Sequence, residues 1–304
     1  MNISDLKYLV AVAEHRHFGH AAEACNISQP TLSTQLKKLE AELGVALLER
    51  NNRSVAVTPV GERVLRHART ILSEAEAIRD IGAGECRPMT GTLAIGCIPT
   101  LAPYMLPWLL PALAADYPDL KPVFTEDLTG NLLQAISEHR LDVAFMALPA
   151  GEGDLEEQAL FDENFLVACH PRHPFANVEA ILRQQMEKED VLYLDDGHCL
   201  REQSIEVCGG PSSGGLGGDF RAASLETLRQ LVAAGFGVTL LPAMAAAQSA
   251  ENRNITVRPF AGPAFRRIGM VWRKSYPGRD SLMLLAGTVR QAAPDTVSVI
   301  EDEA

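Results

Sequence analysis

The 304-residue chain has few of the features that place a protein in a membrane or outside the cell. It contains no run of about eighteen apolar residues, which a membrane-spanning helix requires. Its first residues, MNISDLKYLV, lack the basic lead, apolar core and cleavage site of a secretory signal. Its six cysteines are too few for a disulfide scaffold of this length. We therefore expect a cytoplasmic protein that does not contact membranes and whose thiols are normally reduced.

The sequence also lacks motifs that identify common classes of enzymes and metalloproteins. It contains no P-loop and no glycine-rich dinucleotide fingerprint, and no internal repeat is evident. Its histidines gather in HRHFGH (15–20) and HPRH (170–173), but without the spacing of tetrahedral ligands that a zinc site needs. We therefore expect no metal site and no bound cofactor.

Positive charge is scarce and unevenly distributed along the chain. The net charge is -12, which argues against a protein that binds nucleic acid over its whole surface. Residues 1–66 carry 8 basic and 7 acidic side chains, a balance of +1, and the remaining 19 basic and 32 acidic side chains give -13. This distribution favours a small DNA-binding head on an acidic body, although unrelated chains share it.

The first sixty residues have a helical pattern that is typical of a helix-turn-helix. Leu32, Leu36 and Leu39 form one apolar stripe along a helix. Ser28 can cap the start of this helix, and Pro30 suits its first turn. The side chains beside this stripe carry hydroxyl, amide and ammonium groups that can contact base edges and phosphates in a major groove. The candidate DNA-binding residues on this helix are Gln29, Pro30, Thr31, Ser33, Thr34, Gln35, Lys37 and Lys38. The alternative is an ordinary surface helix with polar residues.

Two further segments complete the N-terminal part. The stretch ERNNRSVAVTPVG (49–61) has the alternation of side chains that is typical of strands. Its Arg50 and Arg53 suit a wing that contacts the DNA backbone. Residues 59–82 have the pattern of one helix roughly 36 Å long. Its apolar side chains are spaced 4, 3, 4 and 3 residues apart, which is a heptad spacing. Such a spacing forms the apolar seam of a helix that pairs with a second copy of itself. The seam comprises Val64, Ala68, Ile71, Ala75 and Ile78, and the alternative is packing against its own domain.

Strands and helices alternate in the rest of the chain. Strand-like apolar runs such as TLAIGCIPT (92–100) are followed by amphipathic helical ones such as SLETLRQLVAAG (224–235). Such alternation predicts a mainly α/β protein with parallel sheets and helices on both faces. Ligands of such sheets bind outside the carboxyl ends of the strands. Here those ends include the loops at 99–100, 125–129 and 197–199.

Cys199 and Cys208 lie nine residues apart in a segment with a helical pattern. Nine helical residues advance the chain about 13 Å and place the two side chains on opposite faces, whereas a disulfide needs Cα atoms within about 7 Å. A disulfide here therefore requires the helix to unwind, and the glycine-rich segment 209–218 supplies slack. Cys199 falls in the first turn, where free amides favour a thiolate. The alternative is a pair of ordinary buried thiols.

Several segments resemble a known family. FGHAAEACNISQPTLSTQLKKLEAELGVALLERNNRSVAVTPVGE (18–62) resembles the winged helix-turn-helix of LysR-type transcriptional regulators. DGHCLREQ (196–203), IPTLAPYMLP (98–107) and FRAASLETLRQLVAAGFGVTLLPA (220–243) are similar to the hydrogen-peroxide sensors within that family. The resemblance covers essentially the whole chain.

This resemblance implies a domain organisation. A winged helix-turn-helix DNA-binding domain is expected at 1–58, a long linker helix for dimerisation at 59–89, and a redox-sensing effector domain at 90–304. The effector domain is expected to have two lobes, like a periplasmic binding protein. Lobe I would comprise about 90–162 and 268–304, and lobe II about 163–267.

The resemblance also implies roles for individual residues. Cys199 would be the thiol that peroxide oxidises and Cys208 the thiol that captures it in a disulfide, beside a peroxide pocket of Thr100, Thr129, His198 and either Arg266 or Arg267. The implied partners are promoter DNA, hydrogen peroxide, cellular thiol reductants, RNA polymerase and further copies of the chain, as a dimer or a dimer of dimers. Two other functions stay open. One is a LysR-type regulator that binds a small metabolite between its lobes, and the other is a thiol peroxidase.

Overall fold

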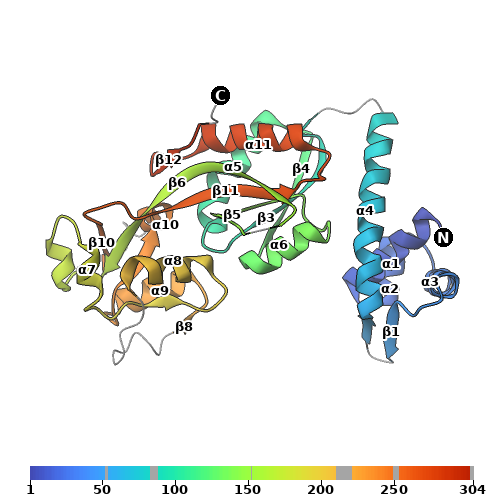
Figure 1. Ribbon diagram of the computed structural model, residues 1–304, viewed down its shortest axis with the longest axis horizontal. Helices are drawn as coiled ribbons and strands as arrows, with labels where there is room; N and C mark the ends of the chain where they lie inside the picture. The colour runs from blue at the N-terminus through green and yellow to red at the C-terminus, as the bar shows by residue number, and fades with distance from the viewer. Residues whose placement is uncertain (52–53, 83–87, 152, 210–220, 249–252, 302–304) are drawn as a thin grey trace. The chain divides into compact units, whose positions relative to one another are not determined.

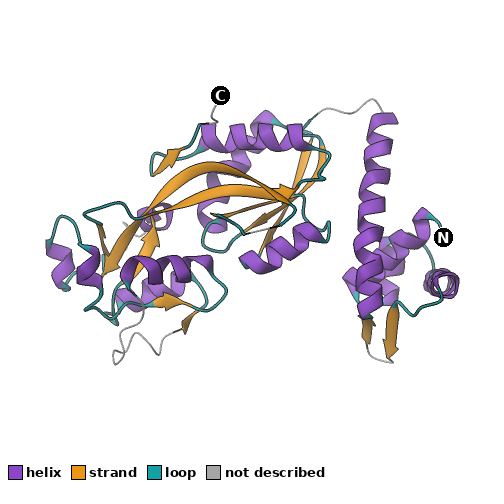
Figure 2. Cartoon of the chain, in the orientation of Figure 1, coloured by secondary structure: helices purple, strands orange, loops and turns teal. Residues whose placement is uncertain are grey.

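In the computed structural model of the protein, residues 1–51, 54–82, 88–151, 153–209, 221–248 and 253–301 are described. The chain divides into two compact units, one of Met1–Arg87 with Ser137–Arg140 and one of Pro88–Ile136 with Leu141–Ala304. The first unit consists of helices and one short hairpin, whereas strands and helices are mixed in the second (Figures 1 and 2). No helix within the described ranges has the length and apolar character that crossing a membrane requires.

Three helices form the core of the first unit: α1 (Ile3–His15), α2 (Phe18–Ala24) and α3 (Gln29–Leu43). Ser28 caps α3 by accepting a hydrogen bond from the Thr31 N–H at 3.3 Å, and the helix ends at Gly44 with a φ of 70°. The predicted apolar stripe of α3 is buried in the core, as the side chains of Leu32, Leu36 and Leu39 are at most 1% exposed. The polar side chains of α3 therefore lie on its outer faces.

A hairpin and a long helix follow α3. Strand β1 (Leu48–Asn51) pairs antiparallel with β2 (Ser54–Val57), which gives the hairpin expected for a wing. The Glu40 carboxylate accepts hydrogen bonds from the N–H groups of Leu47 (2.9 Å) and Leu48 (3.1 Å), so it fixes the base of the hairpin to α3. Thr58 begins α4 (Pro59–Gly82) by accepting a hydrogen bond from the Gly61 N–H at 2.9 Å.

The predicted seam of α4 lies in two environments. Ala68 is buried and Val64 packs against the core of the first unit. Further along the helix, the side chains of Ile71 and Ile78 are 41% and 68% exposed. Large apolar side chains that recur at heptad spacing on an exposed helix favour a partner helix. Pairing of α4 with a second copy stays a prediction.

An eight-stranded mixed sheet runs through the second unit in the order β10-β6-β11-β5-β3-β4, with β9 and β12 also paired to β6. Its strands are β3 (Gly91–Cys97), β4 (Leu120–Glu126), β5 (Val143–Leu148), β6 (Leu155–Cys169), β9 (Thr239–Pro242), β10 (Thr256–Pro259), β11 (Phe265–Arg273) and β12 (Val297–Val299). Within this sheet β3 is parallel to its neighbours β4 and β5, and the other pairings are antiparallel, so the expected parallel arrangement holds only in part. The physical reason is that β11 lies between β5 and β6 and runs antiparallel to both of them.

The helices of this sheet create a crevice at its carboxyl edge. Helix α5 (Ala102–Asp116) follows β3, and α6 (Thr129–Ser137) follows β4. The two helices lie on opposite faces of the sheet, and α11 (Arg279–Ala292) packs beside α5 (Figure 1). The chain thus leaves the ends of neighbouring β3 and β4 in opposite directions, and such switch points are where α/β sheets bind ligands.

Strand β6 is shared by two groups of strands. Residues 155–164 pair with β11, and residues 165–169 pair with β9 and β10. Strand β7 (Tyr193–Leu194) pairs in parallel with β8 (Arg221–Ala222). The adjoining helices are η1 (Pro174–Asn177), α7 (Arg183–Met186), α8 (Cys199–Cys208), α9 (Leu225–Ala233) and α10 (Ala243–Ala247). The lobe boundaries expected at 162/163 and 267/268 fall inside β6 and β11, and β6 belongs to both groups of strands.

Candidate functional site

Three chain segments meet in a narrow pocket at the crevice beyond β3 and β4. They come from the end of β3, the start of α6 and the start of α8. The lining residues are Ile98, Pro99, Thr100, Leu128, Thr129, Gly197, His198 and Cys199. The same segments were expected from sequence as strand ends at 99–100, 125–129 and 197–199. The structure therefore brings together four of the predicted site residues, namely Thr100, Thr129, His198 and Cys199.

A tight turn brings Cys199 into this pocket. Gly197 has a φ of 92°, and a Cβ atom at this position would lie 3.0 Å from Cδ1 of Leu128. The backbone conformation therefore favours glycine, and a Cβ atom at this position would also crowd the Leu128 side chain. The adjacent Asp196 carboxylate forms an ion pair with Arg201, with 3.0 Å between Oδ1 and Nε. This pair balances one of the two acidic charges that precede Cys199.

Helix α8 separates the two cysteines of the predicted pair. It begins at Cys199 and ends at Cys208, and both thiols are free. Nine helical residues span about 13 Å, which exceeds the Cα separation of about 7 Å that a disulfide tolerates. The structure thus has a helix between the two cysteines, as their spacing predicted.

The two thiols have different environments. Cys199 lines the pocket and is partly exposed, whereas Cys208 is 1% exposed. Burial raises the pKa of the Cys208 thiol to about 12, although the positive charge of Arg183 acts in the opposite direction. A buried and protonated thiol is a poor nucleophile. Of the two, only Cys199 is placed to react with a small molecule in the pocket while α8 is folded.

The start of α8 presents backbone amides to Cys199. His198 occupies the N-cap position, but its side chain makes no capping hydrogen bond. The first-turn N–H groups can therefore stabilise a negative charge on Cys199. Burial lowers the pKa of His198, although Asp195 and a hydrogen bond to the backbone of Ala223 oppose the shift. His198 is thus neutral at neutral pH and adds no positive charge to the pocket.

Two threonine hydroxyls supply polar groups to the pocket. The Thr100 hydroxyl accepts a hydrogen bond from Nη1 of Arg266 at 2.9 Å, so its own hydrogen stays free to donate. The Oγ1 atom of Thr129 is buried and has no hydrogen-bond partner within the described part of the chain. An unsatisfied buried hydroxyl is unfavourable. Both hydroxyls are therefore suited to bind a small polar ligand beside Cys199.

The structure distinguishes the two candidate arginines. Arg266 and Arg267 are consecutive in β11, so their side chains point to opposite faces of the sheet. Arg266 is buried and contacts Thr100, whereas Arg267 is exposed and forms an ion pair with Asp162 at 2.8 Å. Arg267 therefore lies outside the pocket, although it was one of the two arginines expected to line it. Arg266 lies behind Thr100 and does not line the pocket directly.

Sequence reasoning missed one charged residue near this site, Glu163. Its carboxylate is fully buried and pairs with Arg266. A signal was present in FDENF (161–165), because alternation places Glu163 on the same strand face as Phe161 and Phe165. Both phenylalanines are buried. A carboxylate on a buried strand face requires a partner.

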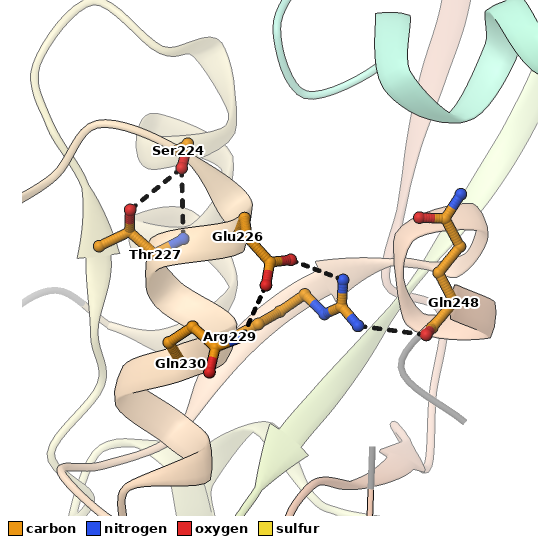
Figure 3. A network of polar contacts seen from close by, with 6 residues as sticks. All are labelled: Ser224, Glu226, Thr227, Arg229, Gln230 and Gln248. Carbon is orange, nitrogen blue, oxygen red and sulfur yellow. Dashed lines mark hydrogen bonds and ion pairs between the residues drawn. The ribbon is translucent and has the colours of Figure 1, made fainter. Parts of the chain in front are cut away.

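A larger cleft of about 510 Å³ adjoins the pocket and shares His198 with it. One wall of this cleft is held by a polar network (Figure 3). Arg229 of α9 binds the Glu226 carboxylate at 2.7 Å and donates to the carbonyl oxygen of Gln248 at 3.1 Å. Since Gln248 follows α10 directly, this network fixes α9 to the end of α10.

The predicted DNA-binding side chains gather on α3. Six of them are exposed (Gln29, Pro30, Thr31, Thr34, Lys37 and Lys38), and Ser33 and Gln35 are half-buried. The Thr34 hydroxyl donates to the carbonyl oxygen of Pro30 at 2.8 Å, and its oxygen can still accept from a DNA base. Arg50 lies in β1, but its side chain is not described, and Arg53 lies outside the described residues.

Some of the other histidines and cysteines lie in structural environments. His17 caps α2, because its Nδ1 accepts hydrogen bonds from the N–H groups of Gly19 (3.1 Å) and His20 (3.3 Å). No group of three or more potential metal-ligating side chains occurs in the described ranges. Cys97 and Cys169 are buried, and burial raises the pKa of both thiols. Cys86 lies outside the residues that the structure describes.

Comparison with known proteins relates this geometry to a family. Residues 3–62 match the family described as "Bacterial regulatory helix-turn-helix protein, lysR family", and residues 87–294 match the "LysR substrate binding domain". The chain is 43% identical over 293 residues to the "DNA-binding transcriptional dual regulator OxyR" of Escherichia coli K12, which covers 95% of each chain. A full-length OxyR structure from Pseudomonas aeruginosa has a TM-score of 0.85 and 34% identity, covering 100% of this chain and 99% of that one. An OxyR structure from Corynebacterium glutamicum with bound H2O2 has a TM-score of 0.67 and 38% identity, covering 97% and 93%.

Proposed function

The chain belongs to the LysR family of bacterial helix-turn-helix regulators, and we propose that it is a member that responds to hydrogen peroxide through Cys199 and Cys208. The family is one of DNA-binding regulators, so the thiol peroxidase alternative is dropped. One observation carries the proposal. A partly exposed Cys199 lies in a pocket with two threonine hydroxyls, while a second thiol is buried at the far end of the same helix.

The first chemical step takes place at Cys199. Its thiolate sulfur attacks one oxygen of hydrogen peroxide, an S–O bond forms and the O–O bond breaks. The sulfur is oxidised to a sulfenic acid, and the other oxygen departs as hydroxide, which takes up a proton to become water. The hydroxyls of Thr100 and Thr129 donate hydrogen bonds to the peroxide oxygens, and the amides of the first turn of α8 stabilise the thiolate.

The second step requires a change of fold. Cys208 is buried and about 13 Å along the helix from Cys199, so α8 must unwind before the two sulfurs meet. The Cys208 sulfur then attacks the Cys199 sulfur, an S–S bond forms and water leaves. The disulfide is incompatible with folded α8, so oxidation selects a second conformation of this unit.

The rest of the chain supplies the regulatory context of this switch. Residues 1–58 would bind promoter DNA through α3 and the wing, residues 59–89 would pair subunits, and residues 90–304 would form the two-lobed redox sensor. The exposed seam residues Ile71 and Ile78 support pairing into a dimer, and we propose a dimer of dimers. Cellular thiol reductants would restore the reduced state, and RNA polymerase would be the target of the activated form in the cytoplasm.

The adjoining cleft supports a second candidate function, the binding of a small metabolite. It has about 510 Å³ of space and is lined by polar groups of Glu226, Arg229 and His198. One experiment separates the two functions. The transcriptional response to peroxide is measured for the unaltered chain, for Cys199→Ser, for Cys208→Ser and for the chain with both substitutions, and a sulfenic-acid trap is applied in parallel.

The proposed switch predicts a different defect for each variant. Cys199→Ser should abolish both the response and the trapped adduct. Cys208→Ser should still give the adduct at Cys199 but form no disulfide. A chain with both substitutions that keeps its full transcriptional response would contradict the peroxide switch and support the metabolite function.

A further inference from the structure

A fully buried ion pair lies behind the peroxide pocket. Glu163 of β6 and Arg266 of β11 face each other across the antiparallel strands, and both side chains are 0% exposed. The Glu163 carboxylate accepts from Nε of Arg266 at 2.9 Å, and Nη2 lies 2.7 Å from the same Oε2 atom. Removing two charges from water is costly, and a pair of apolar residues often stabilises a core as well. The pair therefore calls for an explanation beyond stability.

The remaining hydrogen bonds of this pair lead to the pocket. Arg266 donates to the Thr100 hydroxyl at 2.9 Å and to the Thr100 carbonyl oxygen at 3.0 Å. The other carboxylate oxygen of Glu163 accepts from the Met244 N–H at 2.9 Å, at the start of α10. The carboxylate is thus satisfied at both oxygens, and the guanidinium is held in one orientation. Through Arg266, Glu163 therefore fixes the backbone and the hydroxyl of Thr100, which lines the pocket.

The neighbouring residues provide an internal comparison. Arg267 and Asp162 are the next cross-strand pair in the same register, and they also form an ion pair, at 2.8 Å. Their side chains are 49% and 24% exposed, on the other face of the sheet. The two pairs have the same chemistry on the same strands, but only the buried pair reaches Thr100.

We propose that Glu163 is a positioning residue for the reaction of Cys199 with peroxide, acting through Arg266 on the Thr100 hydroxyl. This proposal rests on the proposed function of the pocket. As the Cys199 sulfur bonds to one peroxide oxygen and the O–O bond breaks, negative charge develops on the departing oxygen. Thr100 donates its hydrogen to that oxygen because its own lone pair is engaged by Arg266. Without Glu163 the guanidinium loses its anionic partner and no longer holds this hydroxyl in place.

The test compares two reagents on the full chain. The rate of sulfenic-acid formation at Cys199 with hydrogen peroxide depends on the position of the Thr100 hydroxyl. The rate of Cys199 alkylation by iodoacetamide reports on its exposure and nucleophilicity alone. Glu163→Gln should slow the peroxide reaction at least about tenfold, as loss of an aligned donor does, and should leave alkylation nearly unchanged. Asp162→Asn, the matched control, should change neither rate.

A double-variant cycle identifies the route of the effect. Thr100→Val should slow the peroxide reaction by itself, and adding Glu163→Gln to Thr100→Val should have almost no further effect. Independent, multiplicative losses would overturn the proposal, and so would equal slowing of peroxide and iodoacetamide in Glu163→Gln. An unaltered chain in which Cys199 does not react with peroxide would instead overturn the proposed function.

A second variant keeps the test decisive if Glu163→Gln does not fold. Glu163→Gln combined with Arg266→Gln removes both buried charges, so it leaves no unpaired charge in the core. Its peroxide reaction should be as slow as that of Thr100→Val, with alkylation nearly unchanged. A peroxide rate equal to that of the unaltered chain would show that the pair has a structural role only and would overturn the proposal.

Discussion

The stability of α8 should set the rate at which the disulfide forms. Glu206 is exposed and lies in the last turns of this helix, away from Cys199. Glu206→Gly and Glu206→Ala remove the same carboxylate, so the two variants differ only in how well they support a helix. Glycine is less favourable than alanine in a helix interior by about 0.8–1.0 kcal/mol. If residue 206 leaves the helix before the S–S bond forms, this difference lowers the barrier for the glycine variant.

The expected magnitude follows from the relation between barrier and rate. A difference of about 0.8–1.0 kcal/mol corresponds to a rate ratio of about four to five, since about 1.4 kcal/mol is tenfold. The glycine variant should therefore convert the Cys199 sulfenic acid to the disulfide up to about five times faster than the alanine variant. The preceding reaction with peroxide should have the same rate in both, because it takes place in the pocket at the other end of α8.

Rapid-quench measurements can follow the two steps separately. The protein is mixed with peroxide, quenched with an alkylating reagent at intervals, and analysed by mass spectrometry for sulfenic acid and disulfide. In parallel, hydrogen exchange of the amides of residues 200–208 should accelerate on oxidation, while that of β3 and β5 stays slow. Equal rates of disulfide formation in the glycine and alanine variants would refute unwinding of α8 as the step that precedes bond formation.

Three other properties can be tested directly. In DNA-binding titrations, Lys37→Ala should weaken binding to all sequences and reduce the salt slope by about 1, whereas Thr31→Ala should weaken specific binding more than random binding; equal losses for Thr31→Ala would exclude a base contact. In sedimentation experiments, Ile71→Asp should shift the protein toward monomer, and an unchanged profile would point to another interface. Burial lowers the pKa of His198 from its usual 6.5, so the unfolded chain binds a proton at His198 more readily than the folded chain does. The folded state therefore loses stability as the pH drops below 6.5. The melting temperature of His198→Gln should therefore fall less between pH 7 and 5, and identical profiles would contradict this environment.

Local chemistry made much of the first unit predictable from sequence. The Ser28 cap, the apolar stripe of α3 and the start of α4 are all encoded within a few residues of where they act. The three pocket loops were also predictable, because strand ends of an α/β sheet meet at one edge. The spacing of Cys199 and Cys208 likewise predicted two separated thiols.

Contacts between distant strands were not predictable. Choosing between Arg266 and Arg267 needs the face of β11 that turns to the core, and sequence adjacency alone does not give it. The partner of Arg266 is Glu163, which lies 103 residues earlier in the chain. The antiparallel course of β6 and β11 was missed because apolar runs do not reveal strand direction. These features depend on which strands pair and in which register, and this pairing is fixed only when the whole sheet has formed.

Counting free thiols before and after one equivalent of hydrogen peroxide tests the proposed switch most directly. The chain has six cysteines, and the reduced protein should give six free thiols under denaturing conditions. After one equivalent of peroxide per subunit, two thiols should be lost, and mass mapping should show a peptide pair joined through Cys199 and Cys208. A chain that keeps all six thiols, or that loses a different pair while Cys199 can still be alkylated, would contradict the switch.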